Sequence, residues 1–176
     1  VDDYDSAIHA MNHLIETGCK KIALFSTIDN LSVGKLRANG YFEALKSNNI
    51  AVNSDLVCVF DNETDFDNLA QKMVANSKLD AIFALDEHAS VSAIKLGLKN
   101  GYKIPEELSI IGFADGVWSK RLSPSLSTVS QHGPEIGEEA ARMLIAKLES
   151  DDDDYTYATK IIKTELRQRE STKKRV

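Results

Sequence analysis

The chain has 176 residues, of which 43% are hydrophobic and 27% are charged, and its formal net charge is -6. This length suits one α/β domain with a sizeable core, and no apolar run approaches the roughly 18 residues that would span a bilayer, which excludes a membrane protein. Residues 160–176 carry seven Lys and Arg against two Glu, whereas the preceding 159 residues carry 14 Lys and Arg against 25 Asp and Glu. Because these 159 residues are so acidic, we do not expect them to form a surface that binds a nucleic-acid backbone.

Helical and extended patterns alternate along the chain, each of ordinary length and separated by short polar joints. We expect helices at about 2–18, 33–48, 66–76, 89–101 and 134–149, and strands at 20–26, 55–60, 80–85, 107–113 and 157–166. This alternation predicts an α/β fold with a doubly wound parallel sheet that is flanked by helices on both faces. Gly40 lies inside the second helix and predicts close packing there, and the run "SDDDDY" predicts a solvated turn.

Four charged residues are expected at one edge of this sheet. Ligands bind outside the carboxyl ends of parallel strands, where Asp61, Asp86 and Asp115 follow three strands and Arg37 follows the first. Carboxylates accept hydrogen bonds from hydroxyl groups and arginine donates to ring or phosphate oxygens. The set predicts a site for a sugar or a sugar phosphate. In the alternative, Asp61 and Asp86 only cap helices and Arg37 is a surface residue.

The sequence lacks the common catalytic and cofactor motifs. No GxGxxG, GxxxxGK[ST] or GxSxG pattern is present, so nucleotide cradles and a serine nucleophile elbow are not expected. The four histidines are scattered, and Cys19 and Cys58 are isolated, so we expect no metal and no disulfide, which is typical of a reducing, cytoplasmic setting. We therefore expect no cofactor and no enzyme activity.

Several segments resemble successive parts of the LacI/GalR family of bacterial transcription regulators. They are "VDDYDSAIHAMNHLIETGCKKIALFS", "LRANGYFEAL", "DAIFALDEHASVSAIKLGLKNGYKIPEELSIIGFAD", "LSPSLSTVSQ" and "EIGEEAARMLIAKL". The resemblance implies a core like that of periplasmic binding proteins, with two α/β lobes joined by three crossovers and a small effector between them. It also implies a homodimer that binds operator DNA through an N-terminal helix-turn-helix upstream of this chain.

On that plan the chain supplies one lobe and parts of another. Residues 1–18 would be a helix left over from a missing N-terminal lobe, 19–131 the C-terminal effector-binding lobe, 132–157 a helix and acidic turn of the missing lobe, 158–171 the last strand of the C-terminal lobe, and 172–176 a basic tail. The two helices assigned to the missing lobe would then expose apolar stripes, Ile8, Met11 and Ile15 on one and Ile136, Ala140 and Leu144 on the other, and would pack together, swing away or meet a second copy.

The resemblance also implies roles for single residues. Arg37 matches the family's effector arginine and Asp86 its acidic residue after the third strand. The family's next carboxylate matches Ala114, and Asp115 stands one place later, where an extended chain points its side chain the opposite way. Trp118 and Leu122 are candidates for a dimer interface, or else they cover the core. A solute-binding protein of a transport system, with the same fold and no DNA-binding domain, is the alternative function.

Overall fold

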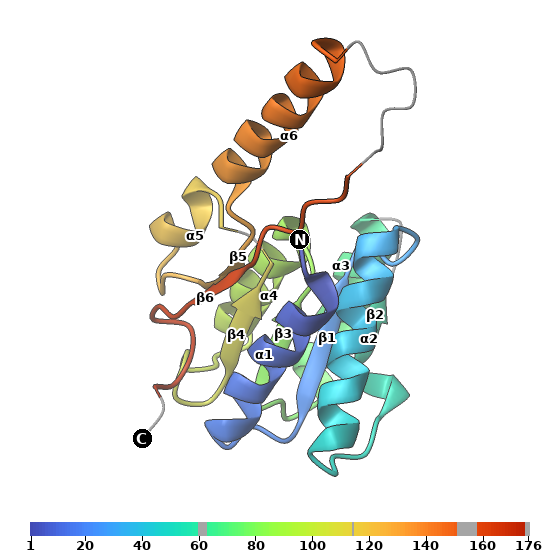
Figure 1. Cartoon of the computed structure of the whole chain (residues 1–176). Helices are drawn as coiled ribbons and strands as arrows, with labels where there is room; N and C mark the ends of the chain where they lie inside the picture. The colour runs from blue at the N-terminus through green and yellow to red at the C-terminus, as the bar shows by residue number, and fades with distance from the viewer. Residues whose placement is uncertain (60–62, 114, 151–157, 175–176) are drawn as a thin grey trace.

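Five parallel strands and one antiparallel edge strand form a single sheet in the computed structural model, which describes residues 1–59, 63–113, 115–150 and 158–174 (Figure 1). The order across the sheet is β2-β1-β3-β4-β5-β6, and only β6 runs against its neighbour, β5. The strands are β1 (Ile22–Ser26), β2 (Val57–Val59), β3 (Ala81–Ala84), β4 (Ser109–Gly112), β5 (Ser127–Ser130) and β6 (Glu165–Arg167).

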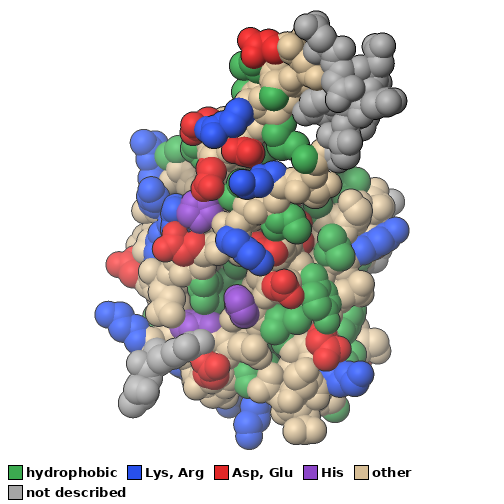
Figure 2. Space-filling model, viewed as in Figure 1, with side chains coloured by type: hydrophobic (Ala, Val, Ile, Leu, Met, Phe, Trp, Pro, Cys, Tyr) green, Lys and Arg blue, Asp and Glu red, His purple; other side chains and the backbone are tan. Residues whose placement is uncertain are grey.

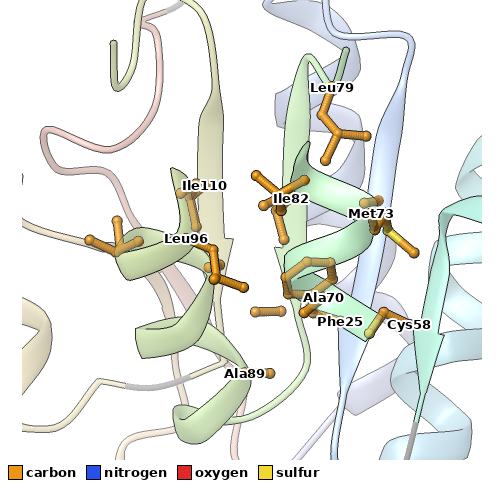
Figure 3. Packing of buried hydrophobic residues seen from close by; sticks show 14 of the residues in the cluster. Phe25, Cys58, Ala70, Met73, Leu79, Ile82, Ala89, Leu96 and Ile110 are labelled. Atoms are coloured by element: carbon orange, nitrogen blue, oxygen red, sulfur yellow. The ribbon is translucent and has the colours of Figure 1, made fainter. Parts of the chain in front are cut away.

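Helices cover both faces of this sheet, as a doubly wound parallel sheet requires. One face lies under α1 (Asp3–Glu16) and α2 (Ser32–Ser47), and the other lies under α3 (Glu63–Asn76) and α4 (Glu87–Lys99). Alternate strand residues enter the two cores, for example Phe25 and Ile82 on the α3 and α4 side, shown in Figure 3, and Leu24 and Phe83 on the other. The predicted fold class is confirmed.

The segment after β4 contains more structure than its sequence indicates. We expected a long joint there, but it holds the short helix α5 (Val117–Arg121) and the strand β5. The sequence of β5, "STVS", has no apolar run, although all four of its residues are buried between β4 and β6. A strand at the position of β5 also extends the edge of the sheet where ligands are expected.

The first helix does not lack a sheet to cover, which corrects our expectation for residues 1–18. Its residues Ala7, Ala10, Met11 and Leu14 are fully buried in the core beneath α1 and α2. Packing is close because Gly40 of α2 has no side chain, and a Cβ there would lie 2.6 Å from the Ala7 Cβ. The helix is therefore part of the same packed body as the strands from β1 onward.

The helix α6 (Gly133–Leu148) projects away from this body, as Figure 1 shows. None of its residues is buried, and its apolar side chains stand among charged ones on the projecting arm at the top of Figure 2. Ile136, Leu144, Ile145 and Leu148 are between 37% and 76% exposed. Among the described residues this agrees with the expectation that the helix swings away from the rest of the chain, which is one of the three arrangements that we considered.

Three predicted features lie outside the described residues. They are Asp61, Ala114 and most of the acidic turn in 150–155. Nothing in the described part of the chain therefore bears on these positions. Among the described residues, no helix has the length and the apolar character to cross a membrane.

Gly40 offers a direct test of the packing that holds α1 on α2. We expect Gly40→Ala to lower the free energy of unfolding by about 1–3 kcal/mol, because the new methyl group overlaps the Ala7 Cβ and the Tyr4 carbonyl oxygen. The control is Gly137→Ala in α6, where a Cβ meets nothing within 4 Å and should stabilise the helix by up to about 1 kcal/mol. Urea unfolding measures both, and equal effects would contradict the packing argument.

Candidate functional site

The candidate site lies at the carboxyl ends of the parallel strands. The residues that follow β3, β4 and β5 come together there with Arg37 of α2. This is the edge at which open α/β sheets bind ligands. The described residues place three of the four predicted site residues, Arg37, Asp86 and Asp115, and they show that each has protein partners.

Arg37 is buried, and its guanidinium is shared among several elements. Its Nε donates to the Asp3 Oδ1 at 2.7 Å, its Nη1 donates to the Leu85 carbonyl oxygen at 2.7 Å, and its Nη2 donates to the Gln131 Oε1 at 3.1 Å. Its Cζ lies 4.1 Å from the centroid of the Phe113 ring. The side chain is only 6% exposed, so the alternative that Arg37 is a surface residue is wrong.

Asp86 is the N-cap of α4 and also binds the segment after β1. Its Oδ1 accepts from the Ala89 backbone N–H at 2.8 Å, and its Oδ2 accepts from the Thr27 backbone N–H at 2.8 Å. Both carboxylate oxygens thus accept from backbone N–H groups, so Asp86 does cap α4. A carboxylate oxygen keeps a second lone pair, and Asp86 can still accept from a hydroxyl group, although its first task is to join two loops at the strand ends.

Asp115 pairs with two arginines of the last strand and the segment after it. Its Oδ1 accepts from Arg169 Nη2 at 2.7 Å and from the Thr128 Oγ1 at 3.0 Å, and its Oδ2 accepts from Arg167. Burial opposes ionisation of this carboxyl group, but the hydrogen bonds from Arg169, Ser130 and Thr128 and the charge of Arg167 outweigh it and lower the pKa of Asp115. Asp115 therefore remains a carboxylate that fastens β6 to the end of β4.

A cavity of about 630 Å³ opens beside this cluster. It lies between the segment that begins at Asp115, the start of α6 and the last strand, and Lys120, Gln131, His132 and Arg167 supply polar groups to its wall. Gln131 belongs both to the cavity and to the partners of Arg37. Gln131 thus links the wall of the cavity to Arg37, which does not itself line the cavity. The cavity is large enough for a small polar molecule.

The structure brings Arg37 and Asp86 together through neighbouring residues, because Arg37 binds the carbonyl oxygen of Leu85. Asp115 lies in a separate group with Arg167 and Arg169. Sequence reasoning missed Asp3, Gln131 and the two arginines as site residues. Gln131 follows β5 directly, so the rule that inspects the residue after each strand could have found it if β5 had been predicted.

The two candidates for a dimer interface have different surroundings. Trp118 on α5 is 62% exposed. Leu122 is half-buried and packs against the core on the α3 and α4 side, as the alternative to an interface role predicts. An interface therefore stays a prediction, and within this pair Trp118 is the residue that a partner could contact.

The cysteines show no features of reactive sites. Both thiols are buried, and burial raises the pKa of Cys58 to about 12 and raises that of Cys19. Thiolates are the nucleophilic form of cysteine, so these side chains act as small apolar residues in the two cores. In the part of the chain that the structure describes, no group of three or more His, Cys, Asp or Glu side chains could hold a metal ion.

Comparison with known proteins shows the family. Residues 11–172 match the periplasmic binding protein-like domain. The chain belongs to this family. The HTH-type transcriptional regulator MalR of Clostridium butyricum is 30% identical over 97% of the chain and 51% of its own length, so the chain spans about half the length of that relative. The relatives and neighbours are regulators of the LacI type, and the LacI/GalR resemblance is confirmed.

Two solved structures of transcription regulators have a fold similar to that of this chain. A putative transcriptional regulator LacI from Bacillus cereus subsp. cytotoxis is 28% identical, with a TM-score of 0.85 over 98% of this chain and 61% of that one. A sugar-binding transcriptional regulator of the LacI family from Escherichia coli, complexed with phosphate, is 25% identical, with a TM-score of 0.83 over 97% and 61%. The names of both proteins describe transcription regulators.

The shared guanidinium of Arg37 predicts a large effect on stability. We expect Arg37→Ala to lower the free energy of unfolding by about 3–5 kcal/mol, because it leaves the buried Asp3 carboxylate without a charged partner. Arg142→Ala on α6 is the matched control. Its side chain is 65% exposed, so the change should stay within about 0.5 kcal/mol. Similar values for the two variants in urea unfolding would refute the role of Arg37 as a buried link.

The lowered pKa of Asp115 predicts a contribution to stability that depends on pH. A carboxyl group whose pKa is lower in the folded state stabilises fully above its unfolded value of about 3.9 and loses that contribution as the pH falls through the folded value. Asp115→Asn should cost about 1–3 kcal/mol at pH 7, and its difference from the unsubstituted protein should shrink below about pH 4. The exposed Asp55→Asn serves as the control in unfolding experiments across this range, and a difference for Asp115→Asn that stays constant with pH would count against the argument.

Proposed function

We propose that this chain is the effector-sensing lobe of a bacterial transcription regulator of the LacI type, which binds a sugar or sugar phosphate in a cleft between two lobes. The observation that carries the proposal is the gathering of Arg37, Gln131 and the adjoining cavity at the carboxyl ends of the strands, in a chain of the periplasmic binding protein-like family. The E. coli neighbour, which its name describes as sugar-binding, supports the class of ligand.

The second lobe and the DNA-binding helix-turn-helix would be supplied upstream of Val1, as the length of the MalR relative supports. Segments from three parts of the chain meet at the same edge. Asp2 accepts from the Thr164 N–H at 3.1 Å, and Arg37 joins Asp3 to Gln131. Three connections to another lobe would pass here, and the exposed apolar side of α6 would pack on it. The complete regulator would act as a homodimer in the cytoplasm, with Trp118 as an interface candidate.

Coupling in such a protein requires an effector that binds one arrangement of the lobes better than the other. One lobe supplies only its own share of the contacts, so this chain alone should bind an effector more weakly than the full-length regulator. The site residues on this side would be Arg37 and Gln131, with Asp86 as an acceptor at the end of β3. Asp115 would contribute indirectly, by holding Arg167 and Arg169 in position.

Calorimetric titration of the full-length protein against a panel of sugars and sugar phosphates tests this function. We expect one class to bind, and we expect Gln131→Ala to weaken the best affinity by about tenfold, since it removes one hydrogen-bonding side chain and the support of Arg37. Gln71→Ala, on the other face of the sheet and bonded to Asn100, is the matched control. If no compound in the panel binds, or if both variants bind equally well, the proposed site is wrong.

A further inference from the structure

The charge of Arg37 is already cancelled inside the protein. The Arg37 Nε and the Asp3 Oδ1 lie 2.7 Å apart, and the two side chains are 6% and 5% exposed. Two opposite charges this close and this far from water form a pair whose net charge is zero, and separating them is costly. A ligand that reaches Arg37 therefore meets a neutral pair and not a free cation.

The remaining donors of Arg37 are partly used as well. A guanidinium has five N–H groups, and three of them point to Asp3, Leu85 and Gln131. The two that remain are one on Nη1 and one on Nη2. Two single donors suit hydroxyl, ring or carbonyl oxygens of an uncharged ligand.

An anionic group would meet unfavourable surroundings at this point. The Asp3 carboxylate, the Leu85 carbonyl oxygen and the face of the Phe113 ring all present negative charge or partial charge around the guanidinium. A second anion on the same guanidinium would lie within a few ångströms of the Asp3 carboxylate, in a region where water screens charges poorly.

The backbone position of Asp3 is fixed by packing. The helix α1 is held on α2 by the close approach at Gly40. Asp2, the residue before Asp3, accepts from the Thr164 N–H at 3.1 Å and pairs with Lys163 Nζ at 3.2 Å. The carboxylate of Asp3 is therefore presented to Arg37 before any ligand arrives.

We propose that Asp3 determines the charge specificity of the site. Because Asp3 neutralises Arg37, the site selects an effector whose group in contact with Arg37 is uncharged. The inference rests on the proposed function and narrows it, because it assigns sugar hydroxyl or ring oxygens, and not a phosphate group, to this point of the cleft. Asp3 is a positioning residue, since it acts through Arg37. A phosphate group that contacts Lys120 in the wall of the cavity is compatible with it.

The test uses Asp3→Asn, which keeps an oxygen that can accept from the Arg37 Nε and removes the negative charge. The probe is inorganic phosphate, followed through the Arg37 Nε–H resonance by NMR. We expect phosphate to bind at Arg37 at least about tenfold more tightly in Asp3→Asn than in the unsubstituted protein. A loss of structure could not produce this gain, so the readout separates charge specificity from a purely structural role.

The matched control is Asp5→Asn, which removes the same charge from the same turn of α1 at an exposed position. It should leave phosphate binding unchanged. An equal gain in Asp5→Asn would show that net charge alone attracts phosphate, and no gain in Asp3→Asn would show that Asp3 does not exclude anions. Either result overturns the proposal.

The unsubstituted protein provides an arm that does not depend on whether Asp3→Asn folds. In that protein the Arg37 resonance should move no more with phosphate than that of the exposed Arg142, and a saturable shift of Arg37 alone would overturn the proposal. The phosphate titration also remains decisive if no sugar in the calorimetric panel binds. A failure of the proposed function and a failure of this inference are therefore distinguishable.

Discussion

A single buried guanidinium joins the elements that meet at the carboxyl ends of the parallel strands. Arg37 comes from α2, and its partners come from the start of α1, the end of β3 and the end of β5. A charge removed from water must be paired and hydrogen-bonded to be tolerated. The ends of these elements are thus held in one arrangement by the need to satisfy Arg37, and the site is ordered because this need is met within the lobe.

The carboxylates at the strand ends serve mainly to organise the chain around them. Asp86 joins the loop after β1 to the start of α4 through two backbone N–H groups, and Asp115 fastens the segment after β4 to the arginines of β6 and its extension. Both carboxylates are of the kind that accepts hydrogen bonds from a ligand rich in hydroxyl groups. Their bonds to the protein mean that the freely available polar groups of the site come from around Gln131 and from the wall of the adjoining cavity.

Among the described residues, the sheet and the helices α1 to α4 form one packed body from which α6 projects. Both faces of the sheet are covered by α1 to α4, while α6 keeps an exposed apolar side. Amphipathic helices gain most of their stability from burying that side. The described part of the chain therefore contains one packed core and one projecting helix with an exposed apolar side.

The sequence alone determined the alternation of helices and strands, the close approach at Gly40 and the edge of the sheet where charged residues gather, because apolar periodicity and strand ends are local features. It did not reveal β5, whose "STVS" is buried by neighbouring strands and not by its own hydrophobicity. It also placed the first helix in a different lobe. Asp3 reaches Arg37, 34 residues away, only because α1 packs on α2. Whether a charged side chain is free to meet a ligand or is already paired is set by such contacts, and these exist only in the tertiary structure.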